Sequence, residues 1–192
     1  MIVANSGTLL ASWTKNLNIS NGRCFAGWGN LVFFDTEEHQ ISHKRKALAK
    51  ITNLGTQWKI IHDFKPTEYL EQTLSLYVAE EYSRRLLVCL EFQFPMIELE
   101  HTILDENNQV QIDTAVESNQ LPKIGEWTRI EISHEKVDGK FFLSLSVGGR
   151  EVGRKHVVDP HLRKLTDVKV YLGGKECFQP GFIRRLVVLK NQ

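Results

Sequence analysis

The stretch that decides the fold reads Gly125-Glu-Trp-Thr-Arg-Ile-Glu-Ile-Ser133, Phe141-Phe-Leu-Ser-Leu-Ser-Val147, Val168-Lys-Val-Tyr-Leu172 and Pro180-Gly-Phe-Ile-Arg-Arg-Leu-Val-Val-Leu189. Apolar and polar residues alternate within these segments, as they do in strands that bury one face. Asp138-Gly139 and Gly148-Gly149 stand between such segments, where hairpin turns need positive φ. The order predicts an antiparallel sandwich that closes on its own C-terminal strand.

The same period of two continues over most of the chain. Thirteen short segments follow it, separated by turns rich in Gly, Asn and Asp, among them Asp105-Glu-Asn-Asn108. The segments are residues 8–14, 30–34, 47–52, 58–64, 73–79, 85–94, 96–104, 109–116, 127–133, 141–147, 151–157, 167–172 and 182–189. We therefore expect an all-β, two-sheet sandwich that forms one domain over residues 1–192.

Residues 35–50 depart from this pattern. They open with Asp35-Thr-Glu-Glu38 and end with His43-Lys-Arg-Lys46, a charge order that suits a helix dipole. The apolar face would be thin, so this segment is predicted to be either one short helix or a long exposed loop.

The composition sets limits on function. A chain of 192 residues buries roughly 70% of its unfolded surface, enough for a core without disulfides. A hydrophobic content of 42% with 24% charged residues excludes disordered and collagen-like classes. A net charge of +1 gives no reason to expect nucleic acid or an anionic membrane as partner. No apolar run approaches ~18 residues, so no membrane insertion is expected.

The cysteines and the N-terminus bear on location. Cys24, Cys89 and Cys177 lack zinc-ligand spacing, and Cys89 stands in an apolar run, as a buried thiol does. Cys24 and Cys177 lie in Gly-rich turns and would form a disulfide if the terminal strands are neighbours. The first residues do not form an evident signal peptide. The sequon at Asn18 fits glycosylation and an extracellular or secreted protein, and a cytoplasmic location is the alternative.

From Trp58 onward, the chain resembles a laminin-G-like module of the concanavalin A-like lectin/glucanase superfamily. The matching motifs are Trp58-Lys-Ile-Ile-His-Asp-Phe-Lys-Pro66, Gly125-Glu-Trp127, Leu143-Ser-Leu-Ser-Val-Gly-Gly-Arg-Glu-Val152, Val168-Lys-Val-Tyr-Leu-Gly-Gly174 and Pro180-Gly-Phe-Ile-Arg-Arg-Leu186. The resemblance implies a jelly-roll sandwich of an extracellular adhesion or recognition protein, often with a calcium-assisted or basic ligand rim. Residues 1–57 match less clearly.

Glu98-Leu-Glu100 resembles part of the E-x-D-x-x-E strand of retaining glucanases on the same sandwich. Residues two apart on a strand point the same way, as an acid and a nucleophile require. Leu99 replaces the central acid and no third acid follows, so the interpretation favours solvent-facing strand glutamates. Motifs for serine nucleophiles, phosphate loops and zinc proteases are absent. We expect no enzyme, with a glycan-degrading enzyme using Glu98 and Glu100 as the alternative.

One turn could hold calcium, which needs several oxygen ligands. Its best candidates are Asp105, Asn107, Asn108 and Asp113 on a single hairpin. The alternative is an ordinary polar turn, because Asn and Asp tolerate left-handed geometry. No other cofactor is expected.

Basic groups recur along the chain and would suit sulfated glycans if they cluster at one rim. They are His43-Lys-Arg-Lys46, Arg154-Lys-His156, Arg163-Lys164 and Arg184-Arg185. Each alone is interpreted as a solvated edge that discourages aggregation, except the dense first run. Trp58 and Trp127 are predicted to pack in the core, whereas an aromatic ring between glycines, as at Trp28, could stack on a sugar.

The sequence thus favours a non-enzymatic module that binds a glycan or an extracellular protein through loops at one rim. The binding candidates are Trp28, Lys44, Arg45, Lys46 and Tyr69. The third hypothesis is a structural domain that self-associates through edge strands, and the oligomeric state stays open.

Overall fold

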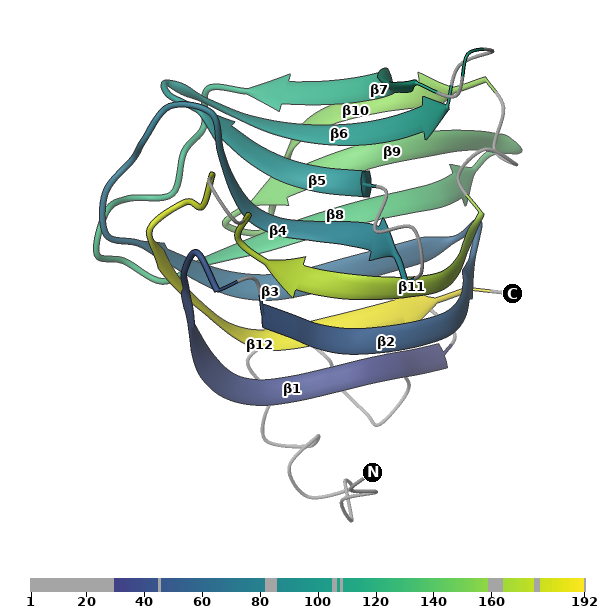
Figure 1. Cartoon of the computed structure of the whole chain (residues 1–192). Helices are drawn as coiled ribbons and strands as arrows, with labels where there is room; N and C mark the ends of the chain where they lie inside the picture. The colour runs from purple at the N-terminus through teal and green to yellow at the C-terminus, as the bar shows by residue number, and fades with distance from the viewer. Residues whose placement is uncertain are drawn as a thin grey trace, which may run out of the picture.

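The chain folds into strands that stack in two layers (Figure 1). The structure is a computed structural model that describes residues 30–44, 46–81, 86–104, 107, 109–158, 164–174 and 177–191. Within these ranges every regular element is a strand, twelve in all, which confirms the all-β prediction. The predicted strand at residues 8–14 lies outside them. No helix in the described part of the chain is long and apolar enough to cross a membrane.

Eleven of the twelve strands follow predicted segments closely, and only β1 extends well beyond its segment. The strands are β1 Asn30–Ile41, β2 Lys46–Gly55, β3 Trp58–Pro66, β4 Thr73–Glu80, β5 Leu86–Gln93, β6 Met96–Leu104, β7 Val110–Ser118, β8 Thr128–Val137, β9 Lys140–Val147, β10 Arg150–Val157, β11 Leu165–Leu172 and β12 Gly181–Lys190.

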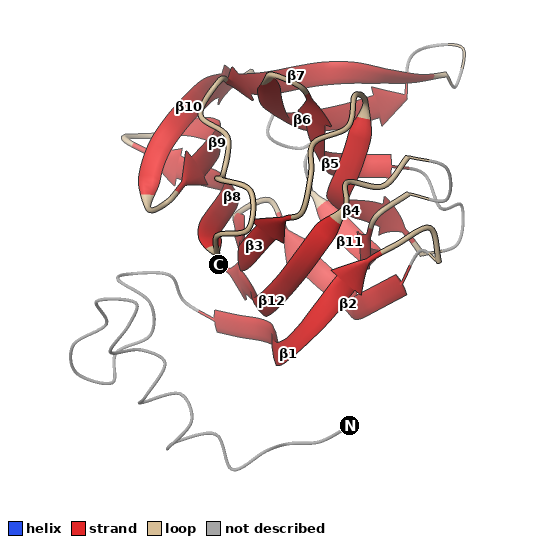
Figure 2. Ribbon diagram, turned by 90° about the vertical axis from the view of Figure 1, so that its left-hand side faces the viewer, coloured by secondary structure: helices blue, strands red, loops and turns tan. Residues whose placement is uncertain are grey.

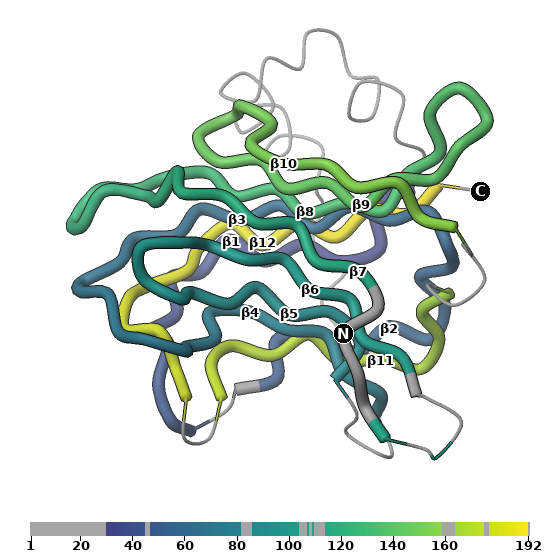
Figure 3. Tube along the Cα trace, turned by 90° about the horizontal axis from the view of Figure 1, so that it is seen from above, coloured from purple at the N-terminus to yellow at the C-terminus, as the bar shows by residue number. Residues whose placement is uncertain are grey.

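Two six-stranded sheets form the sandwich. Sheet A has the order β1-β12-β3-β8-β9-β10 and sheet B the order β2-β11-β4-β5-β6-β7. Figure 2 shows them as two facing layers, and Figure 3 shows the same layers from above. The strand β12 pairs with both β1 and β3, so the C-terminal strand lies inside sheet A and joins β1 to the rest of the sheet. This agrees with the prediction that the sandwich closes on its C-terminal strand.

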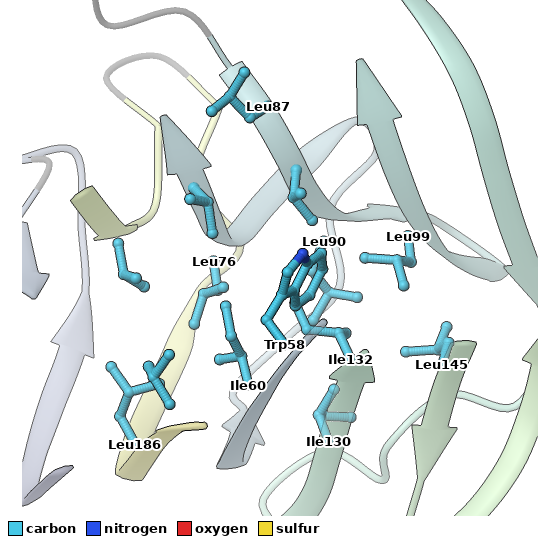
Figure 4. Packing of buried hydrophobic residues seen from close by; sticks show 14 of the residues in the cluster. Trp58, Ile60, Leu76, Leu87, Leu90, Leu99, Ile130, Ile132, Leu145 and Leu186 are labelled. Atoms are coloured by element: carbon cyan, nitrogen blue, oxygen red, sulfur yellow. The ribbon is translucent and has the colours of Figure 1, made fainter. Parts of the chain in front are cut away.

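The core fills the space between the sheets. Trp58 and Ile60 of sheet A pack against Leu76, Leu90 and other residues of sheet B, and all four are fully buried (Figure 4). Period-two alternation explains this arrangement, because every second residue of a strand faces the opposite sheet. The prediction of a core role is confirmed for Trp58, and Cys89 is buried as expected, with 3% of its surface exposed.

The predictions for residues 35–50 are wrong, both as a helix and as a long loop. The strand β1 continues through Glu38 to Ile41, pairs with β12, and is followed after a short turn by β2. Local charge order favours a helix only weakly, whereas pairing with β12 satisfies the backbone and buries Ile41 and His39. Tertiary pairing therefore outweighs the local signal.

The hairpin predictions are confirmed. Asp138 and Gly139 have φ of 50° and 82°, and Gly148 and Gly149 have φ of 63° and 80°. Strand β6 pairs with β7 up to Leu104 opposite Val110, so a hairpin connects them as expected.

Candidate functional site

A β-bulge in β12 places two arginines on the outer face of sheet A. Ile183 and Leu186 both face the core, with two residues between them where strict alternation would leave one. The register against β3 shifts between Arg184 and Val187, and Arg185 has a left-handed φ of 55°. A bulge of this kind redirects side chains. As a result, Arg184 and Arg185 project on the same side of the sheet.

Three guanidinium groups converge on one carboxylate there. Nε of Arg184 and Nη1 of Arg185 lie 3.5 and 3.2 Å from Oδ2 of Asp63. Nε of Arg129, from β8, lies 3.7 Å from Oδ1 of the same side chain. Asp63 stands in β3 directly opposite both Arg184 and Arg129, and only 6% of it is exposed. The pairing of β3 between β12 and β8 therefore builds this group.

Aromatic rings hold the cations in place. The guanidinium of Arg184 lies 4.0 Å from the ring centre of Trp127, and Nζ of Lys65 lies 4.7 Å from the same ring. Lys65 also lies 4.8 Å from the ring centre of Phe182. Cations over aromatic faces at these distances are attracted by the ring quadrupole. Asp63, Lys65, Trp127, Arg129, Arg184 and Arg185 together form what we call the arginine–tryptophan cluster.

The prediction that Trp127 packs in the core is wrong. Trp127 stands two residues before Arg129 and shares its outward direction, so its half-buried ring covers the cations instead. The interpretation of Arg184-Arg185 as a solvated edge is also wrong, because β12 is an interior strand of sheet A. The sequence held a signal for this bulge, since two adjacent arginines between Ile183 and Leu186 interrupt the alternation.

The cluster carries more positive charge than it neutralises. Three arginines lie against the single carboxylate of Asp63, and with Lys65 over Trp127 the cluster has a formal charge of +3. Glu38 stands opposite Arg184 in β1 but is exposed, and it makes no ion pair within the described chain. Nε of Arg129 is buried, and at 3.7 Å from Oδ1 of Asp63 it forms an ion pair but no hydrogen bond with any described residue. The site therefore retains unused donors as well as excess charge.

The other basic group of sheet A is neutralised locally. Nη2 of Arg154 lies 2.6 Å from Glu151 and 4.0 Å from Glu135, and its guanidinium stacks on Phe142 at 5.3 Å. Its Nε donates to the hydroxyl of Ser144 at 3.2 Å. Arg154 is therefore a useful comparison for the cluster.

Glu98 and Glu100 lie on the outer face of sheet B, but they are buried, with 8% and 7% of their surface exposed. The prediction that they face solvent is therefore wrong. Neighbouring strands bring Glu91 opposite Glu98 and Cys89 opposite Glu100, and these side chains cover one another. Burial, reinforced by the charge of Glu100, raises the pKa of both Glu91 and Glu98.

The predicted rim residues are placed only in part. Lys44 is exposed in the turn between β1 and β2, while Trp28, Arg45 and the side chain of Lys46 fall outside what the structure describes. The half-buried ring of Tyr69 packs on Phe92 and its hydroxyl donates to the carbonyl of Pro122. None of the five belongs to the arginine–tryptophan cluster, and their role in binding stays a prediction.

The remaining predicted sites also stay predictions. Asn107 is exposed, but Asp105, Asn108 and the side chain of Asp113 lie outside the described residues, so the calcium prediction is not tested. The same holds for the glycosylation prediction at Asn18 and for the Cys24 partner of the predicted disulfide. The carbonyl of Cys177 accepts hydrogen bonds from the amides of Leu74 and Gly174.

Comparison with known proteins places the fold. No family model and no curated protein sequence matches the chain. A NanB sialidase mutant from Streptococcus pneumoniae is similar with a TM-score of 0.60 and 12% identity, over 83% of this chain and 26% of that one. The CBM40 module of the Ruminococcus gnavus IT-sialidase, bound to α2,3 sialyllactose, is similar with a TM-score of 0.54 and 12% identity, over 84% and 93%. The type G botulinum neurotoxin receptor-binding domain is similar with a TM-score of 0.53 and 10% identity, over 85% of this chain and 48% of that one.

The chain has the fold of a two-sheet antiparallel jelly-roll sandwich. It spans only about a quarter of the length of the sialidase, and identities this low establish the fold and nothing finer.

Proposed function

We propose that this domain recognises an acidic glycan, without catalysis, through the arginine–tryptophan cluster. The observation that carries the proposal is the convergence of three guanidinium groups on the single carboxylate of Asp63. One carboxylate cannot use the donors of three guanidinium groups, so the group can accept a second anion. A sugar carboxylate or sulfate supplies that anion.

The chemistry of recognition follows from the geometry. Guanidinium groups bind carboxylate and sulfate through paired N–H donors, and each such charge-assisted bond contributes about 1.5–3 kcal/mol. Trp127 orients Arg184 and Lys65 in advance, which lowers the entropy cost of binding.

The comparisons support the class of ligand. The Ruminococcus gnavus module of similar fold is bound to sialyllactose, whose sialic acid carries a carboxylate. The arginines of this chain supply the matching chemistry independently of that likeness. We also propose an extracellular, laminin-G-like recognition role, in which the rim with Lys44 and Tyr69 contacts the rest of a glycan or a protein partner.

Calorimetric binding of sialylated, uronate-containing, sulfated and neutral oligosaccharides tests the proposal. We expect the acidic sugars to bind and Arg184→Gln and Arg129→Gln to weaken them by roughly 10–100-fold, because each loses a charge-assisted contact. Arg184→Lys should restore only part of the affinity, since an ammonium lacks the guanidinium fork. The matched control is Arg154→Gln on the same face, which should bind as the wild type does.

Three results would contradict the proposal. Equal affinity of the wild type and Arg184→Gln for acidic sugars would remove the cluster as the site, and loss of affinity in Lys44→Gln alone would move it to the rim. Release of sugar products that stops in the Glu98→Gln, Glu100→Gln double variant would replace recognition by hydrolysis.

A further inference from the structure

The outer face of sheet B carries a second cluster of polar side chains, on the opposite sheet from the arginine–tryptophan cluster. Cys89 and Glu91 alternate on β5, and Glu98 and Glu100 alternate on β6. The register sets Cys89 opposite Glu100 and Glu91 opposite Glu98. All four side chains therefore point away from the core on adjacent strands.

Three of these groups converge at ligand spacing. Sγ of Cys89 and one carboxylate oxygen each of Glu91 and Glu100 lie within 4.8 Å of one another. The thiol of Cys89 donates to Oε2 of Glu100 at 3.2 Å. Donors bound to one tetrahedral cation at about 2.0–2.3 Å lie about 3.3–3.8 Å apart, so side-chain rotations that bring these atoms about 1–1.5 Å closer would place them around a shared ion.

Glu98 provides an independent observation. It is 8% exposed, yet its carboxylate makes no hydrogen bond or ion pair with any part of the chain that the structure describes. The register sets Glu98 between two further glutamates, Glu91 of β5 and Glu117 of β7. A buried carboxylate without a partner is costly unless a cation neutralises it.

Nearby lysines do not supply that cation. Nζ of Lys50 and Nζ of Lys169 both lie against Glu81, at 2.8 and 3.4 Å. Lys155 acts on Glu98 by its charge, but no lysine or arginine in the described ranges forms an ion pair with Glu91, Glu98 or Glu100.

We propose that Cys89, Glu91, Glu98 and Glu100 bind a divalent cation of the Zn²⁺ class. The sulfur ligand selects such a cation over Ca²⁺, which takes oxygen ligands only. On binding, the thiol proton of Cys89 leaves to solvent and the thiolate bonds to the metal, with no change of oxidation state. The carboxylates of Glu91 and Glu100 are the next ligands, and that of Glu98 completes the set. This site is independent of the proposed glycan function.

Titration of the untagged, metal-free chain with Zn²⁺ and with Co²⁺ tests the site. We expect Zn²⁺ to raise the thermal midpoint and Co²⁺ to give a thiolate-to-metal charge-transfer absorption. Cys89→Ser is close to isosteric, and it should abolish that absorption and weaken Zn²⁺ at least tenfold. The control is Glu131→Gln, a half-buried strand glutamate of sheet A, which should bind metal as the wild type does.

The variant Glu100→Gln distinguishes metal binding from a purely structural role of Glu100. That variant should raise the thermal midpoint of the metal-free protein, because it removes like-charge repulsion, while it lowers Zn²⁺ affinity. Absence of the charge-transfer band in the folded wild type would overturn the proposal. So would a band that persists in Cys89→Ser, or equal stabilisation of wild type and Cys89→Ser by Ca²⁺.

Discussion

Replacing Arg185 by glycine and, separately, by alanine should separate the backbone strain at this residue from its ion pair. Its φ of 55° is left-handed, which costs an L-residue about 1–2 kcal/mol and glycine nearly nothing. Alanine loses the contact with Asp63 at 3.2 Å but keeps the strain, so we expect a loss of about 1 kcal/mol. Glycine also loses the contact but relieves the strain, so after the ~0.5–1 kcal/mol entropy cost of glycine in a strand it should be more stable than the alanine variant and within about 1 kcal/mol of the wild type.

The assay is urea unfolding of the wild type and both variants, with acidic-glycan binding measured in parallel. One kcal/mol corresponds to roughly 2–4 °C in thermal midpoint for a chain of this size. Both variants should lose affinity equally, because both lose the guanidinium. The same pair of substitutions at Arg184, where φ is not left-handed, should favour alanine over glycine. If alanine is also the more stable at Arg185, the strain argument is wrong.

Two further predictions concern the sandwich itself. A Cβ at Gly153 would lie 2.4 Å from Cγ1 of Val116, so Gly153→Ala should lower the free energy of unfolding in urea by about 1–3 kcal/mol. The double variant with Val116→Ala should lose less stability than the two single variants add up to, because Val116→Ala removes the clash. Strictly additive losses would show that β7 and β10 do not meet at these residues. His62 is fully buried and its pKa falls to about 3, so the unfolded state binds the extra proton and stability declines as pH drops below about 6.5, by about 2 kcal/mol at pH 5. His62→Leu should remove this part of the pH dependence of the unfolding free energy. The raised pKa values of Glu91 and Glu98 have the opposite effect on stability, but they contribute equally to the wild type and the variant and cancel in the comparison. Parallel stability–pH curves for the wild type and His62→Leu would disprove the assignment.

The strands were predictable because their signal is local. Residues 97–100 alternate between apolar and acidic side chains, and β6 matches its predicted segment at both ends. Residues 35–41 failed for the opposite reason, since what makes them a strand is pairing with β12 at the far end of the chain. Sequence patterns report the periodicity of one segment and cannot report which distant segment will satisfy its backbone.

Only part of the candidate site could be predicted from the sequence, for the same reason. Arg184-Arg185 stands out in the sequence, but Asp63 and Arg129 acquire meaning only through the pairing of β3 with β12 and β8. The burial of Glu98 and Glu100 likewise depends on the neighbouring β5. Each residue type was evident, and the missing information was the register that brings the residues together.

The arginine–tryptophan cluster is costly in three ways that stability does not explain. Arg185 is strained, Nε of Arg129 is buried with only a long ion pair of 3.7 Å to Asp63, and several like charges surround Asp63, which a single bidentate arginine would satisfy. Two unit charges ~6 Å apart repel by about 3 kcal/mol at an effective dielectric constant near 20. Such costs persist where the surrounding fold enforces them and function uses them. A bound anion would satisfy the free guanidinium donors and offset the repulsion between the arginines, so the excess charge that destabilises the cluster favours an acidic ligand.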